Sequence, residues 1–571
     1  LSTTRRHFIN GLAAFFGLSF VQKVARAEDA PADLIVTGAT IHSVDDAYPS
    51  PQAFAVREGR FVFVGSAADA MRLRGTRTIV LDLTGKTVLP GLIDAHLHLV
   101  SIGMALHEVD LFGVGSQADL VARTVAFAKR SPDPWIRGDG WDQNHWPDKA
   151  FPTHQALSAA IPNRAVALER VDGHAVFANA KAMELAGVTR ATPDPAGGRI
   201  VRDANGDPTG VLVDNAVALI ARVIPPPTHE QLRRAALAAA AECHRWGVTG
   251  VGEAATSADD LAVFRELAGE GALDLRNYTR LVDDPQLLAA AFAAGPLSAE
   301  HDGRLWVRGV KLFADGALGS HGAALLAPYS NDPSNSGLMR TTQAHIADVS
   351  QQALQAGFQM SAHAIGDRAN RVVLDAYQAA LTSAPTSDHR FRIEHAQVLS
   401  PQDIPRFAQL KLIASMQTTH QLSDWPWAPT LLGPERIKGA YAWRSMLDTG
   451  VIIANGTDAP VEPVNTLRTF YAAVARDPSQ RMTPDEALKS MTIWAAHANF
   501  QEEYIGSITP GKYADFVVID RDWLTVSPNG ILDTKILATY FNGSEVFDAS
   551  KLESTARLGL RPSQRKSPCC A

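Results

Sequence analysis

Several features that would each mark a class of protein are missing from this sequence. Only three of its 571 residues are cysteine, so no disulfide framework is expected to hold the fold. There is no GxSxG elbow, no P-loop, no GxGxxG after a predicted strand and no HExxH, so serine hydrolases, nucleotide-binding proteins and zincin proteases lack support. No stretch of about 18 apolar residues is present, so we expect no insertion into a membrane.

Basic residues are also in the minority, with 53 Lys and Arg against 60 Asp and Glu, and the formal net charge is −7. Residues 1–27 hold four basic and no acidic side chains, so the charge without them is −11. A surface of this sign disfavours nucleic acid and anionic membranes as partners. We therefore expect a small-molecule partner, with a homodimer left open.

The first 27 residues have the features of an export signal. Arg5 and Arg6 precede Phe8 and Ile9, a short apolar run follows over residues 11–21, and Ala25-Arg26-Ala27 has a small-x-small cleavage pattern. This arrangement resembles a twin-arginine signal peptide. It predicts a periplasmic or secreted protein, and the alternative is a cytoplasmic N-terminal helix with two chance arginines.

The two ends of the remaining chain share one pattern. Short β-branched runs broken by Gly and Asp fill residues 28–89, and similar runs return over residues 500–555. The pattern predicts a small β-sandwich domain built from both ends, with the middle of the chain as a second domain.

Between these ends, predicted strands alternate with helical segments. Two capping boxes mark helix starts, Thr228 with Gln231 and Thr483 with Glu486. Eight strands are predicted, at residues 90–99, 247–254, 276–282, 306–314, 358–364, 391–398, 412–418 and 450–459. The alternation predicts a TIM (β/α)₈ barrel over residues 90–499. Residues 100–227 form a long insertion after the first strand, which we expect over the active face as part of the pocket.

Residues that bind metals recur where these predicted strands end. His96 and His98 lie two positions apart, so their side chains point the same way from a strand. Each later residue alone has an ordinary explanation, as a buried histidine, a solvated lysine or a turn aspartate. Together they predict a metal site at the carboxyl end of the barrel, formed by His96, His98, Lys311, His363, His395 and Asp458.

This order of residues resembles the amidohydrolase superfamily. The lead-in "VLPGLIDAHLHL" and the late segment "GSITPGKYADFVVID" extend the resemblance over nearly the whole chain after residue 27. The segments "KLFADGALGSHGA", "SAHAIGDRA", "RIEHAQ" and "GTDAPVEP" resemble its YtcJ-like (amidohydrolase 3) branch, which includes N-substituted formamide deformylase.

The resemblance implies two Zn²⁺ ions per chain, one held by His96, His98 and Asp458 and the other by His363 and His395. A carboxylated Lys311 would bridge them through its carbamate oxygens. Histidine nitrogen and carboxylate oxygen suit zinc, and other divalent metals stay open. The alternative is a single metal with unmodified Lys311 as a bystander.

The implied reaction is hydrolysis of an amide by a metal-activated hydroxide. Asp458 would take the proton of the attacking water and pass it to the leaving amine, and His174 would donate to the substrate carbonyl. Further candidates for substrate binding are Asp315, His321, Gln417, His420 and Trp141. Each has a structural alternative, as a turn residue, a helix cap or lid packing.

Other functions remain open at this stage. The same site could cleave a cyclic imide, a lactone or a carbamate, since a fold does not fix its substrate. A non-catalytic exoenzyme-regulatory protein on this scaffold is a third hypothesis. The presence of all six ligand residues favours an enzyme that acts on a small N-acyl or N-formyl amine.

Overall fold

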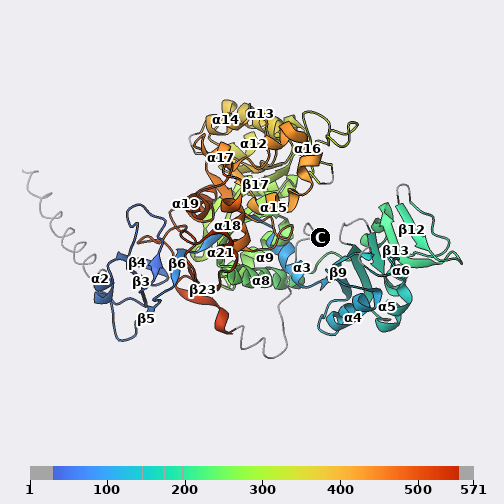
Figure 1. Cartoon of the computed structure of the whole chain (residues 1–571), viewed down its shortest axis with the longest axis horizontal. Coiled ribbons are helices and arrows are strands. Elements are labelled where there is room, and N and C mark those ends of the chain that lie inside the picture. Colours follow the sequence, from blue (N-terminus) through green and yellow to red (C-terminus); the bar gives the residue numbers. More distant parts are fainter. Residues whose placement is uncertain are drawn as a thin grey trace, which may run out of the picture.

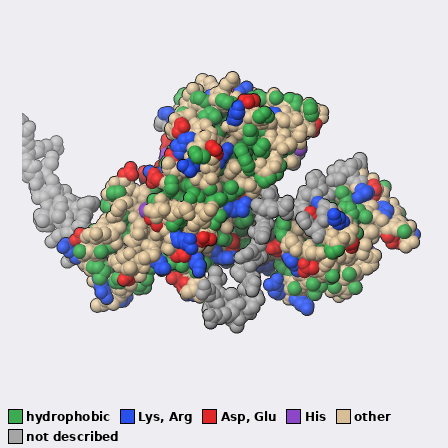
Figure 2. All heavy atoms as spheres, viewed as in Figure 1, with side chains coloured by type: hydrophobic (Ala, Val, Ile, Leu, Met, Phe, Trp, Pro, Cys, Tyr) green, Lys and Arg blue, Asp and Glu red, His purple; other side chains and the backbone are tan. Residues whose placement is uncertain are grey.

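The computed structural model describes residues 30–143, 146–170, 175–195, 198–319, 321–386 and 388–551. The predicted export signal and His174 lie outside these ranges. Among the described residues, no helix combines the length and the apolar character needed to cross a membrane. Figure 2 shows acidic and basic side chains interspersed over one face of the molecule.

Eight parallel strands form a nearly closed barrel at the centre of the molecule (Figure 1). Neighbours around the barrel follow chain order: β7 (Leu92–Leu97), β14 (Val248–Thr256), β15 (Arg276–Val282), β17 (Leu305–Phe313), β18 (Gln359–Ala364), β19 (Arg392–His395), β20 (Ile413–Met416) and β21 (Ile453–Asn455). Each overlaps one of the eight predicted segments, so the predicted TIM (β/α)₈ barrel is confirmed.

Helices alternate with these strands and pack on the outside of the barrel. The main ones are α8 (His229–Arg245), α9 (Ala258–Gly269), α10 (Pro285–Ala294), α12 (Gln343–Ala356), α13 (Asp367–Ser383), α14 (Ile404–Gln409), α17 (Trp443–Leu447), α18 (Thr466–Ala475), α19 (Pro484–Ser490) and α20 (Ile493–Ala498). Both predicted capping boxes are present, at the starts of α8 and α19. Shorter elements complete the barrel loops: β16 (Leu297–Ala299), α11 (Glu300–Gly303), α15 (Thr418–Asp424), α16 (Ala428–Arg436) and η3 (Ile437–Gly439).

The last barrel strand is joined to the first by hydrogen bonds between β7 and the residues that follow β21. The Asp94 carboxylate accepts from the Thr457 backbone N–H at 3.1 Å and from its hydroxyl at 2.6 Å. The Asp458 N–H donates to the His96 carbonyl at 2.7 Å. Gly456 permits this approach, since a Cβ there would lie 2.5 Å from the His96 nitrogen. The barrel therefore closes at the place where two predicted ligands lie.

Two further sheets are built from the ends of the described chain, the first from N-terminal strands alone and the second from strands of both ends. One has the order β4–β3–β1–β5 and the other β2–β6–β22–β23–β24. Their bounds are β1 (Leu34–Thr37), β2 (Thr40–Ile41), β3 (Ala53–Arg57), β4 (Arg60–Gly65), β5 (Ile79–Asp82), β6 (Thr87–Pro90), β22 (Phe516–Ile519), β23 (Ile536–Phe541) and β24 (Ser544–Asp548), with helices α2 (Ala67–Arg72) and α21 (Pro528–Leu532).

A shared core joins these two sheets. Phe54 and Phe516, from opposite ends of the chain, are both fully buried, with ring centroids 5.1 Å apart. Burial of this apolar surface stabilises the pairing of the two ends. The predicted sandwich of both ends agrees with these sheets, and its exact boundaries, 28–89 and 500–555, stay a prediction.

The long interval between β7 and β14 contains its own α/β unit, which lies to one side of the barrel in Figure 1. Its sheet has the order β12–β13–β11–β10–β9–β8. Its elements are α3 (Leu99–Leu106), β8 (Val109–Asp110), α4 (Gln117–Ala128), β9 (Trp135–Trp141), α5 (His154–Ala160), β10 (Ala165–Arg170), β11 (Ala175–Ala178), α6 (Ala180–Ala186), β12 (Gly198–Arg202), β13 (Pro208–Asp214), η2 (Asn215–Val217) and α7 (Ala218–Ala221). Helix α3 attaches this unit to the barrel by packing on α8, where a Cβ on Gly103 would lie 1.8 Å from the Ala235 carbonyl oxygen.

One buried arginine links the barrel to the two-sheet unit. Arg276, at the start of β15, pairs through two nitrogens with the Asp515 carboxylate, each at 2.8 Å, and donates to Asn542 at 2.5 Å. Its guanidinium also lies 4.0 Å from the ring centroids of Tyr513 and Phe541. A charge buried this way is tolerated because each of its partners is in place.

We expect Arg276→Met to destabilise the protein by about 3–5 kcal/mol, because it leaves the Asp515 carboxylate buried without its charge partner. The measurement is chemical denaturation followed by circular dichroism. Arg190→Met is the control, since Arg190 pairs with Asp207 at the exposed surface, and its unfolding midpoint should not move. Equal midpoints for the two variants would contradict the assignment.

Candidate metal centre

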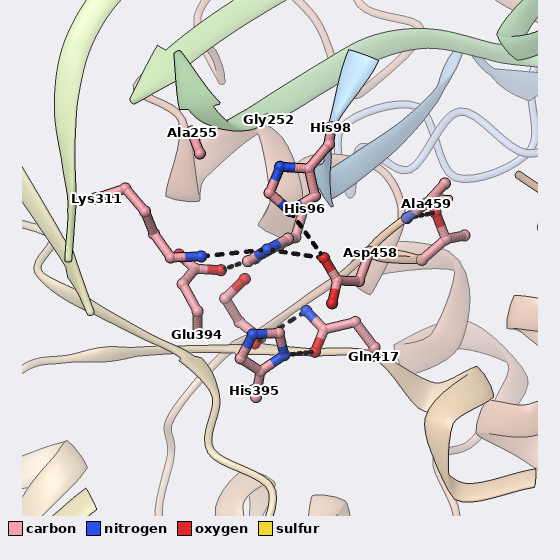
Figure 3. A network of polar contacts seen from close by, with 12 residues as sticks. His96, His98, Gly252, Ala255, Lys311, Glu394, His395, Gln417, Asp458 and Ala459 are labelled. Atoms are coloured by element: carbon pink, nitrogen blue, oxygen red, sulfur yellow. Dashed lines mark hydrogen bonds and ion pairs between the residues drawn. The ribbon is translucent and has the colours of Figure 1, made fainter. Parts of the chain in front are cut away.

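The carboxyl ends of the barrel strands bring the six predicted ligands into one volume, and Figure 3 shows five of them, all except His363. Strand β7 ends beside His96 and His98, β17 carries Lys311, β18 carries His363, β19 ends at His395, and Asp458 follows β21. All are buried except His98 and His363, whose side chains are 25% and 12% exposed. This is the end of a barrel at which active sites form.

Asp458 lies at the middle of the group. Its Oδ1 is 3.3 Å from His96 Nε2 and 3.2 Å from His98 Nε2. Lys311 Nζ lies 3.4 Å from the same His96 nitrogen. Among the described residues, ligand atoms of His96, His395 and Asp458 all lie within 4.8 Å of one another.

His363 extends the group on the side of His395. The two ring centroids are 4.5 Å apart. The Nε2 of His363 is buried without a hydrogen-bond partner, and its nearest carboxylate oxygen is Asp315 Oδ1 at 3.3 Å. A buried imidazole nitrogen without a hydrogen-bond partner is unusual in a folded protein. Such a nitrogen can bind a metal ion or another ligand.

The backbone is bent at two of the ligands. His395 has φ +72° and Asp458 has φ +58°, a region that side chains other than glycine rarely occupy. Such conformations cost of order 1–3 kcal/mol and cluster at functional sites. At these two positions the bend directs a ligand inward from the end of a strand.

Burial sets the protonation states of the group. It lowers the pKa of His96 to about 4, with a further effect from Lys311, and holds the pKa of His395 well below its usual range. Burial lowers the pKa of Lys311 to about 8. Burial acts to raise the pKa of Asp458, but His96 and His98 hold it well below its usual range. Neutral imidazoles and an ionised carboxylate are the states that a metal requires of its ligands.

A charged cluster that the sequence analysis missed lies beneath the ligands, inside the barrel. Glu394 accepts a hydrogen bond from His96 Nδ1 and pairs with Arg280 at 2.9 Å and Arg392 at 2.6 Å. The three side chains are fully buried. Burial acts to raise the pKa of Glu394, but the two guanidiniums hold it well below its usual range. The signal in the sequence is the pair of polar residues at i and i+2 in "FRIEHAQV", a strand otherwise expected to be apolar.

Two candidates for substrate binding instead contact ligand histidines. Gln417 is 4% exposed, and its Oε1 lies 2.8 Å from His395 Nδ1. Asp315 is fully buried and accepts three backbone N–H groups, from Ala324 at 2.9 Å, Ile365 at 3.0 Å and Gly366 at 2.9 Å. The polar atoms of Gln417 and Asp315 thus have protein partners that include ligand histidines, and their role in substrate binding stays a prediction.

Two other candidates lie closer to solvent. His420, on α15, has its Nε2 4.0 Å from Asp458 Oδ2, and its ring stacks on His395 with centroids 6.0 Å apart. His321 lies in the loop after β17, with its Nε2 3.2 Å from Asn331 and its ring 4.6 Å from that of Tyr329. His420 therefore joins the group, whereas the contacts of His321 are with its own loop.

Trp141 lies in the core of the inserted unit. It is fully buried, and its indole N–H donates to the Leu168 carbonyl at 2.9 Å. Its ring packs beside Trp146, Phe151 and Phe177. The structure therefore gives Trp141 a packing position, and contact with a substrate stays a prediction for it. The role of the insertion in a pocket stays a prediction.

The donor set fits a divalent metal of the zinc type. It offers imidazole nitrogens and a carboxylate oxygen from several strands, at mutual distances that one ion can span. Buried nitrogens of His363 and His420 without hydrogen-bond partners face the same group. We therefore identify this group as the candidate metal centre.

Comparison with known proteins agrees with this geometry. The profile of a family described as "Amidohydrolase family" matches residues 80–547. The Arabidopsis thaliana protein LONG AFTER FAR-RED 3 is 35% identical, over 90% of this chain and 92% of that protein. YtcJ of Bacillus subtilis is 31% identical over 90% and 99% of the two chains. The N-substituted formamide deformylase of Arthrobacter pascens is 29% identical over 90% and 97%.

A solved structure gives the same result for the fold. An uncharacterized metal-dependent hydrolase from Pyrococcus furiosus superimposes with a TM-score of 0.74 at 30% identity, covering 86% of this chain and all of that one. The predicted resemblance to the amidohydrolase superfamily and its YtcJ-like branch is confirmed.

The position of Trp141 predicts the result of its removal. Trp141→Ala should destabilise the inserted unit by about 3–5 kcal/mol, through the cavity that it leaves, and should not change the metal content. Thermal unfolding and elemental analysis of the purified protein measure the two effects. Leu185→Ala is the control, because this leucine lies in the same inserted unit and is 49% exposed. A stable Trp141→Ala protein with an altered substrate preference would instead support a substrate-binding role for Trp141.

Proposed function

This chain belongs to the amidohydrolase family, and we propose that it hydrolyses a non-peptide carbon–nitrogen bond in a small N-acyl or N-formyl amine. The observation that carries the proposal is the group of His96, His395 and Asp458, whose ligand atoms lie within 4.8 Å of one another at the mouth of the barrel. Similarity to a formamide deformylase over nearly both full chains favours an amide as the substrate.

The metal is proposed to be zinc, two ions per chain, with His96, His98 and Asp458 on one side and His363 and His395 on the other. When bound, a divalent metal lowers the pKa of a water molecule toward neutrality and polarises the scissile carbonyl. Lys311 would bridge the two sides after its neutral amine adds CO₂, with formation of an Nζ–C bond and loss of one proton. The buried position of this lysine, 3.4 Å from His96, supports that role.

Asp458 has the geometry of a proton carrier. Its Oδ1 faces His96 and His98, whereas its Oδ2 lies on the side of His420. Oδ2 would accept the proton of the attacking water and return it to the departing nitrogen. An ionised carboxylate is required at the first of these steps, and the neighbouring histidines keep Asp458 in that form.

Exposed apolar side chains near the group favour an apolar substituent on the substrate. Trp425 directly follows the helix that carries His420 and is 42% exposed. Val461 is 60% exposed, and its N–H donates to the Asp458 carbonyl at 2.9 Å. A binding surface of this kind would hold an N-alkyl or N-aryl group by burial of apolar area.

Export is a further part of the proposal. The paired arginines at the N-terminus and the −11 charge of the chain after residue 27 support a periplasmic or secreted enzyme that acts on a small molecule.

The proposed bridge of carboxylated Lys311 predicts how much metal the protein holds. Wild-type protein purified without chelator should hold about two equivalents of metal, and Lys311→Ala one or none. Elemental analysis of both proteins measures this. Lys438→Ala is the control, since Lys438 pairs with Glu435 at the surface, and it should retain the wild-type content. A single equivalent in every protein would replace the two-metal site by a mononuclear one.

The proton carrier predicts the second result. Asp458→Asn should retain most of the metal, because an amide oxygen can still coordinate, and should lose roughly 10²–10⁴-fold in kcat on its best substrate. A screen of N-formyl and N-acyl amines supplies that substrate, and Asp448→Asn serves as an exposed control. Near-normal turnover in Asp458→Asn would rule out this role for Asp458.

A further inference from the structure

We propose that Glu394, fixed between two buried arginines, is a positioning residue that aims the Nε2 of His96 at the metal. The inference rests on the metal centre of the proposed function. It assigns a role to a side chain that lies beneath the ligands and cannot reach a substrate, since it is fully buried.

The contact to His96 decides which of its nitrogens can bind a metal. Glu394 Oε2 accepts the hydrogen bond from Nδ1, so the proton of the neutral imidazole is on that side. The lone pair is then on Nε2, which faces Asp458 at 3.3 Å and Lys311 at 3.4 Å. Figure 3 shows His96 between Glu394 and Asp458. Rotation of the ring would break this bond and leave an anion buried without its histidine.

The carboxylate itself is held on both of its oxygens. Arg280 lies 2.9 Å from Oε1, Arg392 lies 2.6 Å from Oε1 and 3.4 Å from Oε2, and the Ser361 hydroxyl also donates to Oε1. A carboxylate with these partners can neither rotate nor take up a proton readily. The Glu394 carboxylate, held in place by these partners, therefore holds the His96 ring in one orientation.

Arg280 and Arg392 are themselves held by hydrogen bonds to the strands of the barrel. Arg280 donates to the Gly252 carbonyl at 2.7 Å, and Arg392 donates to the Ala95 carbonyl at 2.8 Å and to the Ser415 hydroxyl at 2.6 Å. These acceptors belong to β14, β7 and β20, and the arginines to β15 and β19. Five of the eight strands therefore hold one carboxylate against one ligand.

Among the described residues, His395 and His363 have partners of a different kind. His395 has a neutral amide, Gln417 Oε1 at 2.8 Å, on its Nδ1. His363 has Asp315 at 3.3 Å, and the oxygens of Asp315 already accept three backbone N–H groups. A carboxylate partner orients a histidine and makes it a stronger donor to the metal. His96 should therefore hold metal more tightly than His395 or His363.

The test measures metal binding and needs no substrate. Apo protein is titrated with Co²⁺ in competition with a chromophoric chelator, and the visible absorption of the bound Co²⁺ is recorded. Glu394→Gln keeps the shape of the side chain but removes its charge. We expect its Co²⁺ affinity to fall by about 10–100-fold, with a changed absorption spectrum.

Glu394→Asp is the second variant, because Glu394→Gln could unfold by leaving two arginines without a counter-charge. Aspartate keeps the charge for the arginines but is one methylene shorter, so it withdraws from His96. We expect a folded protein, by circular dichroism, with a similar loss of Co²⁺ affinity. Ser361→Ala is the matched control, since Ser361 contacts the same carboxylate but not the histidine, and its affinity should stay within about twofold of wild type.

The outcomes separate the inference from the proposed function. Wild-type affinity and spectrum in folded Glu394→Asp would overturn the positioning role and leave the metal centre intact. Equal losses in Glu394→Asp and Ser361→Ala would assign Glu394 to general stability and overturn it as well. A wild-type protein that binds no Co²⁺ would overturn the metal centre, and the inference with it.

Discussion

The closure of the barrel between β7 and β21 is the constraint on which the candidate site depends. Asp94 bonds Thr457 across that junction, and the backbone of Asp458 bonds that of His96. Burial raises the pKa of Asp94 to about 6, a sign of how far this carboxylate is from solvent. Two ligands separated by 362 positions in the chain thereby become neighbours, and Gly456 is the residue that allows the approach.

The interior of this barrel is more polar than the usual layers of branched apolar side chains. Arg280, Arg392 and Glu394 occupy it, each fully buried. Burial of such charges costs several kcal/mol per ion unless each is paired and hydrogen-bonded. Here backbone carbonyls of two strands, β7 and β14, and the hydroxyls of Ser361 and Ser415 complete the pairing. Each charged side chain of this cluster is therefore stable in the interior only while its partners are present. The cost of burying these charges is consistent with the role of Glu394 proposed above, which is to position His96.

The parts of the chain outside the barrel have cores of their own. The inserted unit packs around Trp141 and Phe177, and the two-sheet unit packs around Phe54 and Phe516. Separate cores let the surroundings of the barrel vary without disturbing the packing around the ligands. The candidate ligands lie at the ends of barrel strands, whereas residues that select a substrate can lie on loops and inserted segments.

Local patterns in the sequence predict the barrel and the set of candidate ligand residues. Alternation of β-branched runs with capped helices, such as the one that begins at Thr228, is a local pattern, and carboxyl ends of parallel strands always gather at one end of a barrel. Which polar residue contacts which candidate ligand depends on contacts between distant parts of the chain. Glu394 meets His96 across 298 positions, and Gln417 meets His395 through the register of two neighbouring strands. Trp141 likewise could face a pocket or a core with the same local sequence. The reason is that strand register and domain packing set these distances, and both arise from contacts between residues far apart in the chain.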